Sequence, residues 1–141
     1  MTVPEGKRTK SKLDFHTKAI ELAVYTKQIC NNNNIFPKRD RWILANRLVD
    51  ASVAILVNVV KANGVFVSSR ETYEKRLAYQ RLARDATLEM LALMDFAYAV
   101  YPIGGRRMGH WTKLVSDERK LILAWMKSDR DRFTAQYKGS K

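Results

Sequence analysis

Apolar residues recur at helical spacing over four long stretches of this chain. In the first, residues 14–31, Phe15 and Ala19 fall on one side of a helix with 3.6 residues per turn. Asp14 supplies a side chain that can cap the free amides at the start of such a helix. The four consecutive asparagines at 31–34 favour a turn. The pattern therefore predicts a first helix over residues 14–31.

The second stretch starts after Pro37, ends before Gly64 and is apolar around most of its circumference. The β-branched run at 53–60 would also suit a strand, but its length and its lack of alternation favour a helix. A helix with so little polar surface is expected to be buried on more than one side. Its narrow polar strip consists of Arg47, Asp50, Asn58 and Lys61.

The third stretch begins after a capping serine, Ser68 or Ser69, and continues to about Val100. The turn-forming sequence at 102–105 ends it. A fourth stretch covers residues 107–137, where apolar residues again recur on one side.

Four long amphipathic helices joined by short connections favour an all-α fold, an antiparallel up-down-up-down four-helix bundle. We expect this bundle to span residues 13–137 as one domain. The short basic segments on either side, residues 1–12 and 138–141, are interpreted as disordered tails.

The third predicted helix carries more apolar residues than one face can hold. Its main face includes Leu82, Ala86 and Leu93, and a second group falls elsewhere on the helix, namely Leu77, Leu88 and Leu91. Together with the nearly all-round apolar second helix, this group indicates a second contact surface. Homo-oligomerisation would bury that surface, and a thick core within one chain is the alternative.

Net charge is the most informative total. The 141 residues include 26 Lys and Arg against 14 Asp and Glu, which gives +12 and a pI near 10.0. A small folded domain with such an excess usually binds a polyanion. Nucleic acid, RNA and possibly DNA, is the preferred partner, ahead of an acidic protein and an anionic lipid surface.

One candidate contact surface is a basic stripe on the fourth helix. Its members stand seven residues apart, so they drift only about 20° per step around a straight helix. They lie opposite the Trp111 face and are therefore expected to be exposed. An ordinary solvated helix back is the alternative. The stripe consists of Arg106, Lys113, Lys120 and Lys127.

A second candidate surface lies on the third helix, whose arginines suit bidentate phosphate contacts. Neighbouring acids would pair with some of them. Arg107 adds a cation where a glycine-rich connection enters a helix N-terminus, which attracts anions. The third-helix arginines are Arg70, Arg76, Arg81 and Arg84.

Catalytic and metal-binding patterns are not found in the sequence. The two histidines, His16 and His110, lack Cys, Asp or Glu partners at metal-ligand spacing. His16 is expected on the buried side of its helix. We therefore predict a non-enzyme without cofactor or metal. The single cysteine, Cys30, and the short apolar run at 51–57 favour a soluble, cytoplasmic protein without a membrane span.

The stretch Phe36-Pro37-Lys38-Arg39-Asp40-Arg41, leading into an apolar helix with Ile55 and Asn58, resembles a known family. This is the four-helix-bundle family of proteins encoded in intervening sequences of bacterial 23S ribosomal RNA genes. The later half is more similar to the accessory variability determinant (Avd) proteins of diversity-generating retroelements. That half is represented by residues 73–77, Tyr79-Gln80, residues 110–114, Trp125 and residues 128–130.

Departures from the ribosomal-gene pattern at Ala54, Lys61 and Ala62 favour the retroelement branch. The resemblance implies a basic, barrel-like homopentamer that binds a reverse transcriptase and nucleic acid. Such a protein supports mutagenic complementary-DNA synthesis from template RNA, while the polymerase carries out the chemistry. A structural oligomer of the intervening-sequence type, without a nucleic-acid role, is the alternative. A helical ribonuclease that uses His110 is a third hypothesis.

Overall fold

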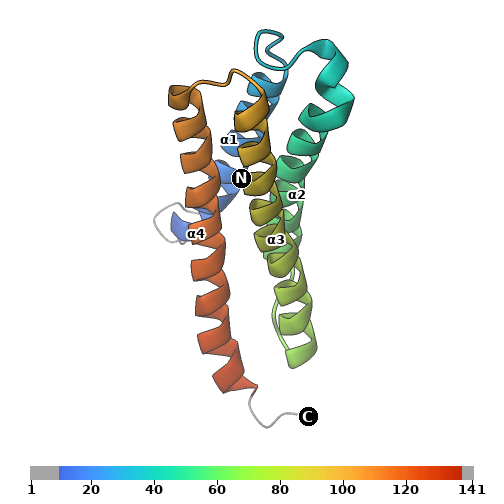
Figure 1. Ribbon diagram of the computed structural model, residues 1–141. Helices are drawn as coiled ribbons and strands as arrows, with labels where there is room; N and C mark the ends of the chain where they lie inside the picture. Colours follow the sequence, from blue (N-terminus) through green and yellow to red (C-terminus); the bar gives the residue numbers. More distant parts are fainter. Residues whose placement is uncertain (1–9, 138–141) are drawn as a thin grey trace.

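The computed structural model describes residues 10–137, with side chains from Phe15 onward. Within this range the chain forms four α-helices and no strand, which confirms the all-α class (Figure 1). The predicted tail segments 1–9 and 138–141 lie outside the described residues. The helices are α1 (Lys10–Cys30), α2 (Asn46–Asn63), α3 (Arg70–Val100) and α4 (Gly105–Gln136).

Helix α1 begins at Lys10, four residues before the predicted start, so residues 10–12 belong to a helix rather than to a tail. Its end follows the prediction. The amide of Asn34 donates to the side-chain oxygen of Asn32 at 2.9 Å, which is the local turn that asparagine favours. The chain then turns inward, since Ile35 and Phe36 are both buried.

The second helix has the predicted extent, but its opening is not α-helical. A short 3-10 helix, η1 (Lys38–Asp40), and a π-helical turn, η2 (Arg41–Ala45), precede α2. Within this turn Leu44 and Ala45 are buried, in step with the buried Leu48 of α2, and Trp42 is 83% exposed.

Helix α3 begins at the predicted serine cap. The Ser69 hydroxyl oxygen accepts from the Thr72 amide at 3.1 Å, and the Thr72 hydroxyl oxygen accepts from the Ser69 amide at 2.9 Å. This reciprocal pair is a capping box. Helix α4 begins after Gly104, whose φ of +86° is a conformation that favours glycine.

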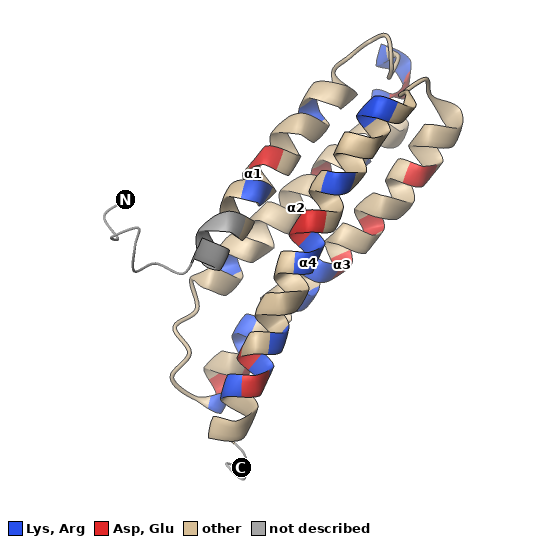
Figure 2. Ribbon diagram, turned by 90° about the vertical axis from the view of Figure 1, so that its left-hand side faces the viewer, with Lys and Arg blue, Asp and Glu red and all other residues tan. Residues whose placement is uncertain are grey.

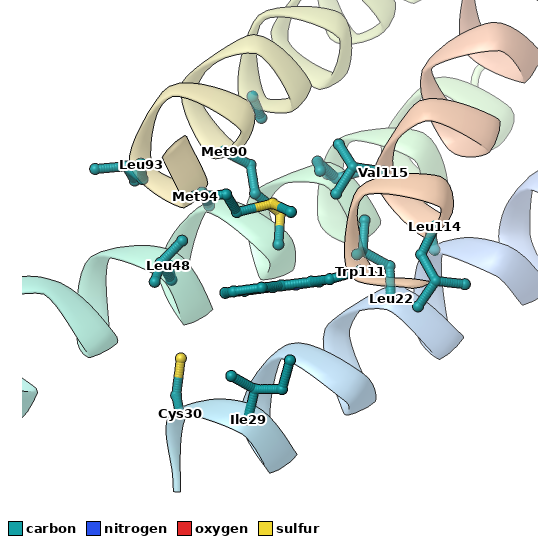
Figure 3. Packing of buried hydrophobic residues seen from close by; sticks show 14 of the residues in the cluster. Leu22, Ile29, Cys30, Leu48, Met90, Leu93, Met94, Trp111, Leu114 and Val115 are labelled. Carbon is teal, nitrogen blue, oxygen red and sulfur yellow. The ribbon is translucent and has the colours of Figure 1, made fainter. Parts of the chain in front are cut away.

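Each helix packs against two neighbours: α1 and α3 both contact α2 and α4. Trp111 of α4 is fully buried in the shared core, and its indole N–H donates to the Thr26 hydroxyl of α1 at 2.9 Å. Figure 3 shows the Trp111 ring extending from α4 between Met94 on α3 and Ile29 on α1. One core therefore joins side chains from all four helices.

Two residues and one helix face that were predicted to be buried are exposed. His16 is exposed, because the core face of α1 follows Phe15 and Ala19 and His16 lies about 100° away from Phe15 around the helix. Leu82 is exposed for the same reason, being one residue before the buried Ala83. Helix α2 is buried on one side only, and its outward face carries the exposed residues Val53, Val57 and Val60.

One helical stretch, Lys38–Asn63, is long and apolar enough to cross a membrane by length and composition alone. The core helix of a soluble protein passes the same test. Within this stretch Leu48, Ile55 and Val59 are buried against the rest of the chain. Its apolar character is therefore partly accounted for by the core.

Candidate nucleic-acid interface

The stripe predicted on α4 is exposed along its whole length. Arg106, Lys113, Lys120 and Lys127 all lie on the surface, away from the buried Trp111 and Trp125. Figure 2 shows basic segments recurring along α4, with acidic segments between them. The predicted geometry of the stripe is therefore present.

Half of the stripe is paired within its own helix. The Lys113 ammonium lies 2.7 Å from Asp117, and the Lys127 ammonium lies 3.0 Å from Asp131. The hydrogen bond from Lys113 is the main cause that lowers the pKa of Asp117, so this carboxylate remains ionised beside the lysine. A phosphate would compete with these carboxylates for Lys113 and Lys127. The stripe thus offers less positive charge than its sequence suggests.

Among the third-helix arginines, Arg76 does not lie on an exposed side as predicted. It is buried, with its guanidinium 3.1 Å from the Asp129 carboxylate of α4 and donating to the Val65 carbonyl at 2.9 Å. Gln80 also donates to Asp129, at 3.0 Å. Because Asp129 is 53 residues away in the chain, helical spacing within α3 gives no indication of this pair.

The other predicted arginines remain at the surface. Arg70 pairs with Glu74 at 3.4 Å, and the partly exposed Arg84 pairs with Asp85 at 3.1 Å. Arg81 and Arg107 are exposed and form no ion pair with a described acidic residue. Four residues of the predicted binding surfaces thus form no ion pair within residues 15–137, namely Arg81, Arg106, Arg107 and Lys120.

A denser basic region lies where the α1–α2 and α3–α4 connections meet. The Phe36 and Tyr101 rings are 4.6 Å apart between centroids, so they join the two connections. Partial burial and a hydrogen bond with Asp40 raise the pKa of Tyr101. Both connections lie at the same end of the molecule (Figure 1). We call its six cations the loop-end cluster: Lys38, Arg39, Arg41, Arg47, Arg106 and Arg107.

The acidic complement of the loop-end cluster is small. Residues 31–49 and 101–110 contain one acidic residue, Asp40, which is engaged with Tyr101 and lies 4.0 Å from Arg39. The next acid, Asp50, lies one helical turn after Arg47 and forms no ion pair with it. The Arg41 guanidinium donates to the side-chain oxygen of Asn33 at 2.8 Å. This partner is neutral, so it does not cancel the charge of Arg41. Sequence reasoning missed Lys38, Arg39, Arg41 and Arg47 as site residues, although three of the four residues at 38–41 are basic. The density of basic residues at 38–41 is the sequence feature that could have identified them.

Outside the basic surfaces, His110 and Cys30 are side chains of types that can take part in chemistry. His110 is exposed and lies edge-on to Tyr25, with ring centroids 4.7 Å apart. No group of three His, Cys, Asp or Glu side chains that could hold a metal ion occurs among the described residues. Cys30 is buried, and this burial raises the pKa of its thiol to about 12, so the thiol stays protonated.

A cavity of about 630 Å³ opens between Phe15, the α2–α3 connection and α4. Four aromatic side chains contribute to its walls, and its polar wall includes the Arg76–Asp129 pair. A volume in this range suits a small molecule. The Arg76 and Asp129 charges are, however, engaged with one another, and they hold α3 against α4.

No protein-family model, curated protein or solved structure shows a significant match to this chain.

Proposed function

We propose that this protein is a basic, nucleic-acid-binding accessory protein built as an antiparallel up-down-up-down four-helix bundle. It associates with the reverse transcriptase of a diversity-generating retroelement and supports mutagenic complementary-DNA synthesis from template RNA. The contacts of each helix with two neighbours are compatible with this bundle order. The assignment to the retroelement branch rests on the sequence resemblance.

The observation that carries nucleic-acid binding is the loop-end cluster. Its six cations gather at one end of the molecule. Residues 31–49 and 101–110, which carry them, contain one acidic residue, Asp40, and Asp40 lies near both Tyr101 and Arg39. Phosphates can approach these cations without displacing a strongly bound carboxylate. A net charge of +12 adds long-range attraction for a polyanion. Contacts of this kind recognise the backbone and shape of RNA rather than its sequence.

A homo-oligomer is part of the proposal, and the outward face of α2 supports it. Val53, Val57 and Val60 are exposed on this face, and Leu88 and Phe96 are exposed on the adjacent α3. A single chain leaves these apolar side chains in water, whereas a second copy would cover them. The number five comes from the resemblance. The same observation favours the alternative function, a structural oligomer of the intervening-sequence type.

In this proposal the polymerase supplies the chemistry, and the accessory protein has no catalytic residue, cofactor or metal. It acts in the cytoplasm, where its partner transcribes the template RNA. An adjacent reverse-transcriptase gene with a template-like repeat would favour the retroelement role over the structural one.

The direct test is binding of a structured RNA at increasing salt concentration. Counterion release predicts that the logarithm of the binding constant falls linearly with the logarithm of salt, with a slope that reports the phosphates engaged. We expect a steep slope that corresponds to about four or more phosphate contacts. Absence of RNA binding at low salt would reject the accessory role and leave the structural oligomer.

A further inference from the structure

Trp42 is an exposed tryptophan at the end of the molecule that carries the loop-end cluster. Its side chain is 83% exposed, whereas Trp111 and Trp125 are buried in the core. In the π-helical turn η2 the buried residues are Leu44 and Ala45. Trp42 therefore contributes little to the core, and its ring is free to meet a partner.

The chain around Trp42 is strongly basic. Lys38, Arg39, Arg41 and Arg47 all lie within five residues of it, and the Arg39 side chain is 88% exposed. The acid in this segment, Asp40, lies near Tyr101 and contributes to raising the pKa of its hydroxyl group. An aromatic face and several cations are thus available together at one position.

This combination suits an unpaired nucleotide. Cations neutralise the phosphates, and an aromatic ring stacks on the exposed face of a base, whatever its identity. In a duplex the faces of the bases are stacked on one another. An exposed aromatic side chain therefore has few free base faces to stack on, and it adds little to duplex binding. A symmetric contact between two copies through this surface would bring two basic segments together, which like-charge repulsion disfavours.

We propose that Trp42 is a stacking platform for an unpaired base of RNA or single-stranded DNA whose phosphates are held by Lys38, Arg39 and Arg47. This inference rests on the proposed nucleic-acid binding and adds to it the single-stranded character of the ligand. It also assigns a position for the contact on the α1–α2 connection.

The test compares Trp42→Ala with Phe66→Ala as a matched control. Phe66 is also 83% exposed, but it lies on the α2–α3 connection, at the other end of α2. The ligands are an unstructured single-stranded RNA and a duplex RNA of the same length. Base stacking on an aromatic side chain corresponds to roughly a 5- to 150-fold change in affinity. We expect Trp42→Ala to weaken single-strand binding within this range and to leave duplex binding within about twofold.

Trp42→Phe keeps an aromatic face, so we expect it to retain most of the single-strand affinity. Phe66→Ala should bind both RNAs as the wild type does. Stacking should also quench the fluorescence of the exposed indole, and the quenching should disappear in Trp42→Phe.

Several outcomes would overturn the inference. An equal loss for single-stranded and duplex RNA in Trp42→Ala would show that the ring acts on shape or charge and not by stacking. A lower oligomer mass in Trp42→Ala would identify the ring as a subunit contact. Unchanged affinity of Trp42→Ala for single-stranded RNA would reject the stacking role of Trp42 and leave the proposed function intact. A wild-type protein that binds neither RNA would reject both.

Discussion

At the scale of single residues, Glu118 places a carboxyl group inside the core. It is fully buried on α4, and neither of its carboxylate oxygens has a hydrogen-bond partner among the described residues. Burial raises the pKa of this carboxyl to about 8, and the charge of Lys18 on α1 opposes the rise. A group that prefers to be neutral thus lies inside the folded protein at physiological pH.

Glu118 makes stability depend on pH. Between its unfolded value of 4.5 and its folded pKa of about 8, the folded state keeps the proton and the unfolded state loses it. Unfolding then releases a proton, so the free energy of unfolding falls as pH rises through this window. We expect a decrease of a few kcal/mol for the wild type, and a much smaller one for Glu118→Gln.

Denaturant unfolding at pH 5 and at pH 8 measures this difference. Glu89→Gln on the exposed side of α3 is the control, and it should follow the wild type. If Glu118→Gln also parallels the wild type between the two pH values, Glu118 does not keep its proton in the folded state.

At the scale of helices, Arg76 and Asp129 connect α3 to α4 inside the protein. Their side-chain atoms lie 3.1 Å apart, and Arg76 also binds the Val65 carbonyl of the α2–α3 connection. Removing one partner of a buried pair leaves an uncompensated charge, which costs about 3–5 kcal/mol. We expect Arg76→Met or Asp129→Leu alone to lower the unfolding free energy by about this amount.

The double variant Arg76→Met with Asp129→Leu tests the pairing. It removes both charges and fills the space with apolar atoms, so most of the lost stability should return. Thermal unfolding of the two single variants and the double variant forms a double-mutant cycle. Additive losses would show that the two side chains do not act as a pair.

Sequence patterns predicted the elements well because helices are specified by local signals. The capping serine Ser69 and the apolar spacing of α4 each act within a few residues. The sequence did not predict the burial of Arg76, since its partner is distant in the chain. It also did not predict the exposure of Trp42, because apolar residues cover most of the circumference of the predicted second helix and do not mark its outward face. The site was therefore predicted less well than the fold.

At the scale of the whole molecule, the outward face of α2 predicts self-association. Val57 is 40% exposed at the middle of this face, and Leu123 on α4 is 39% exposed. We expect Val57→Asp to reduce the oligomer to the 16.3 kDa monomer and Leu123→Asp to leave it assembled. Light scattering after size-exclusion chromatography gives the mass. A wild type that is already monomeric would contradict the prediction.

The charge of the whole molecule leads to the central claim, that the loop-end cluster binds nucleic acid. The most direct measurement compares the salt dependence of RNA binding for two variants of equal net charge. Arg39→Gln with Arg47→Gln changes the cluster, and Lys75→Gln with Arg130→Gln changes exposed cations outside it. We expect the first pair to reduce the slope by about 1.5 and the second to change it little. Equal reductions by both pairs would show that RNA responds to net charge alone and would contradict the claim.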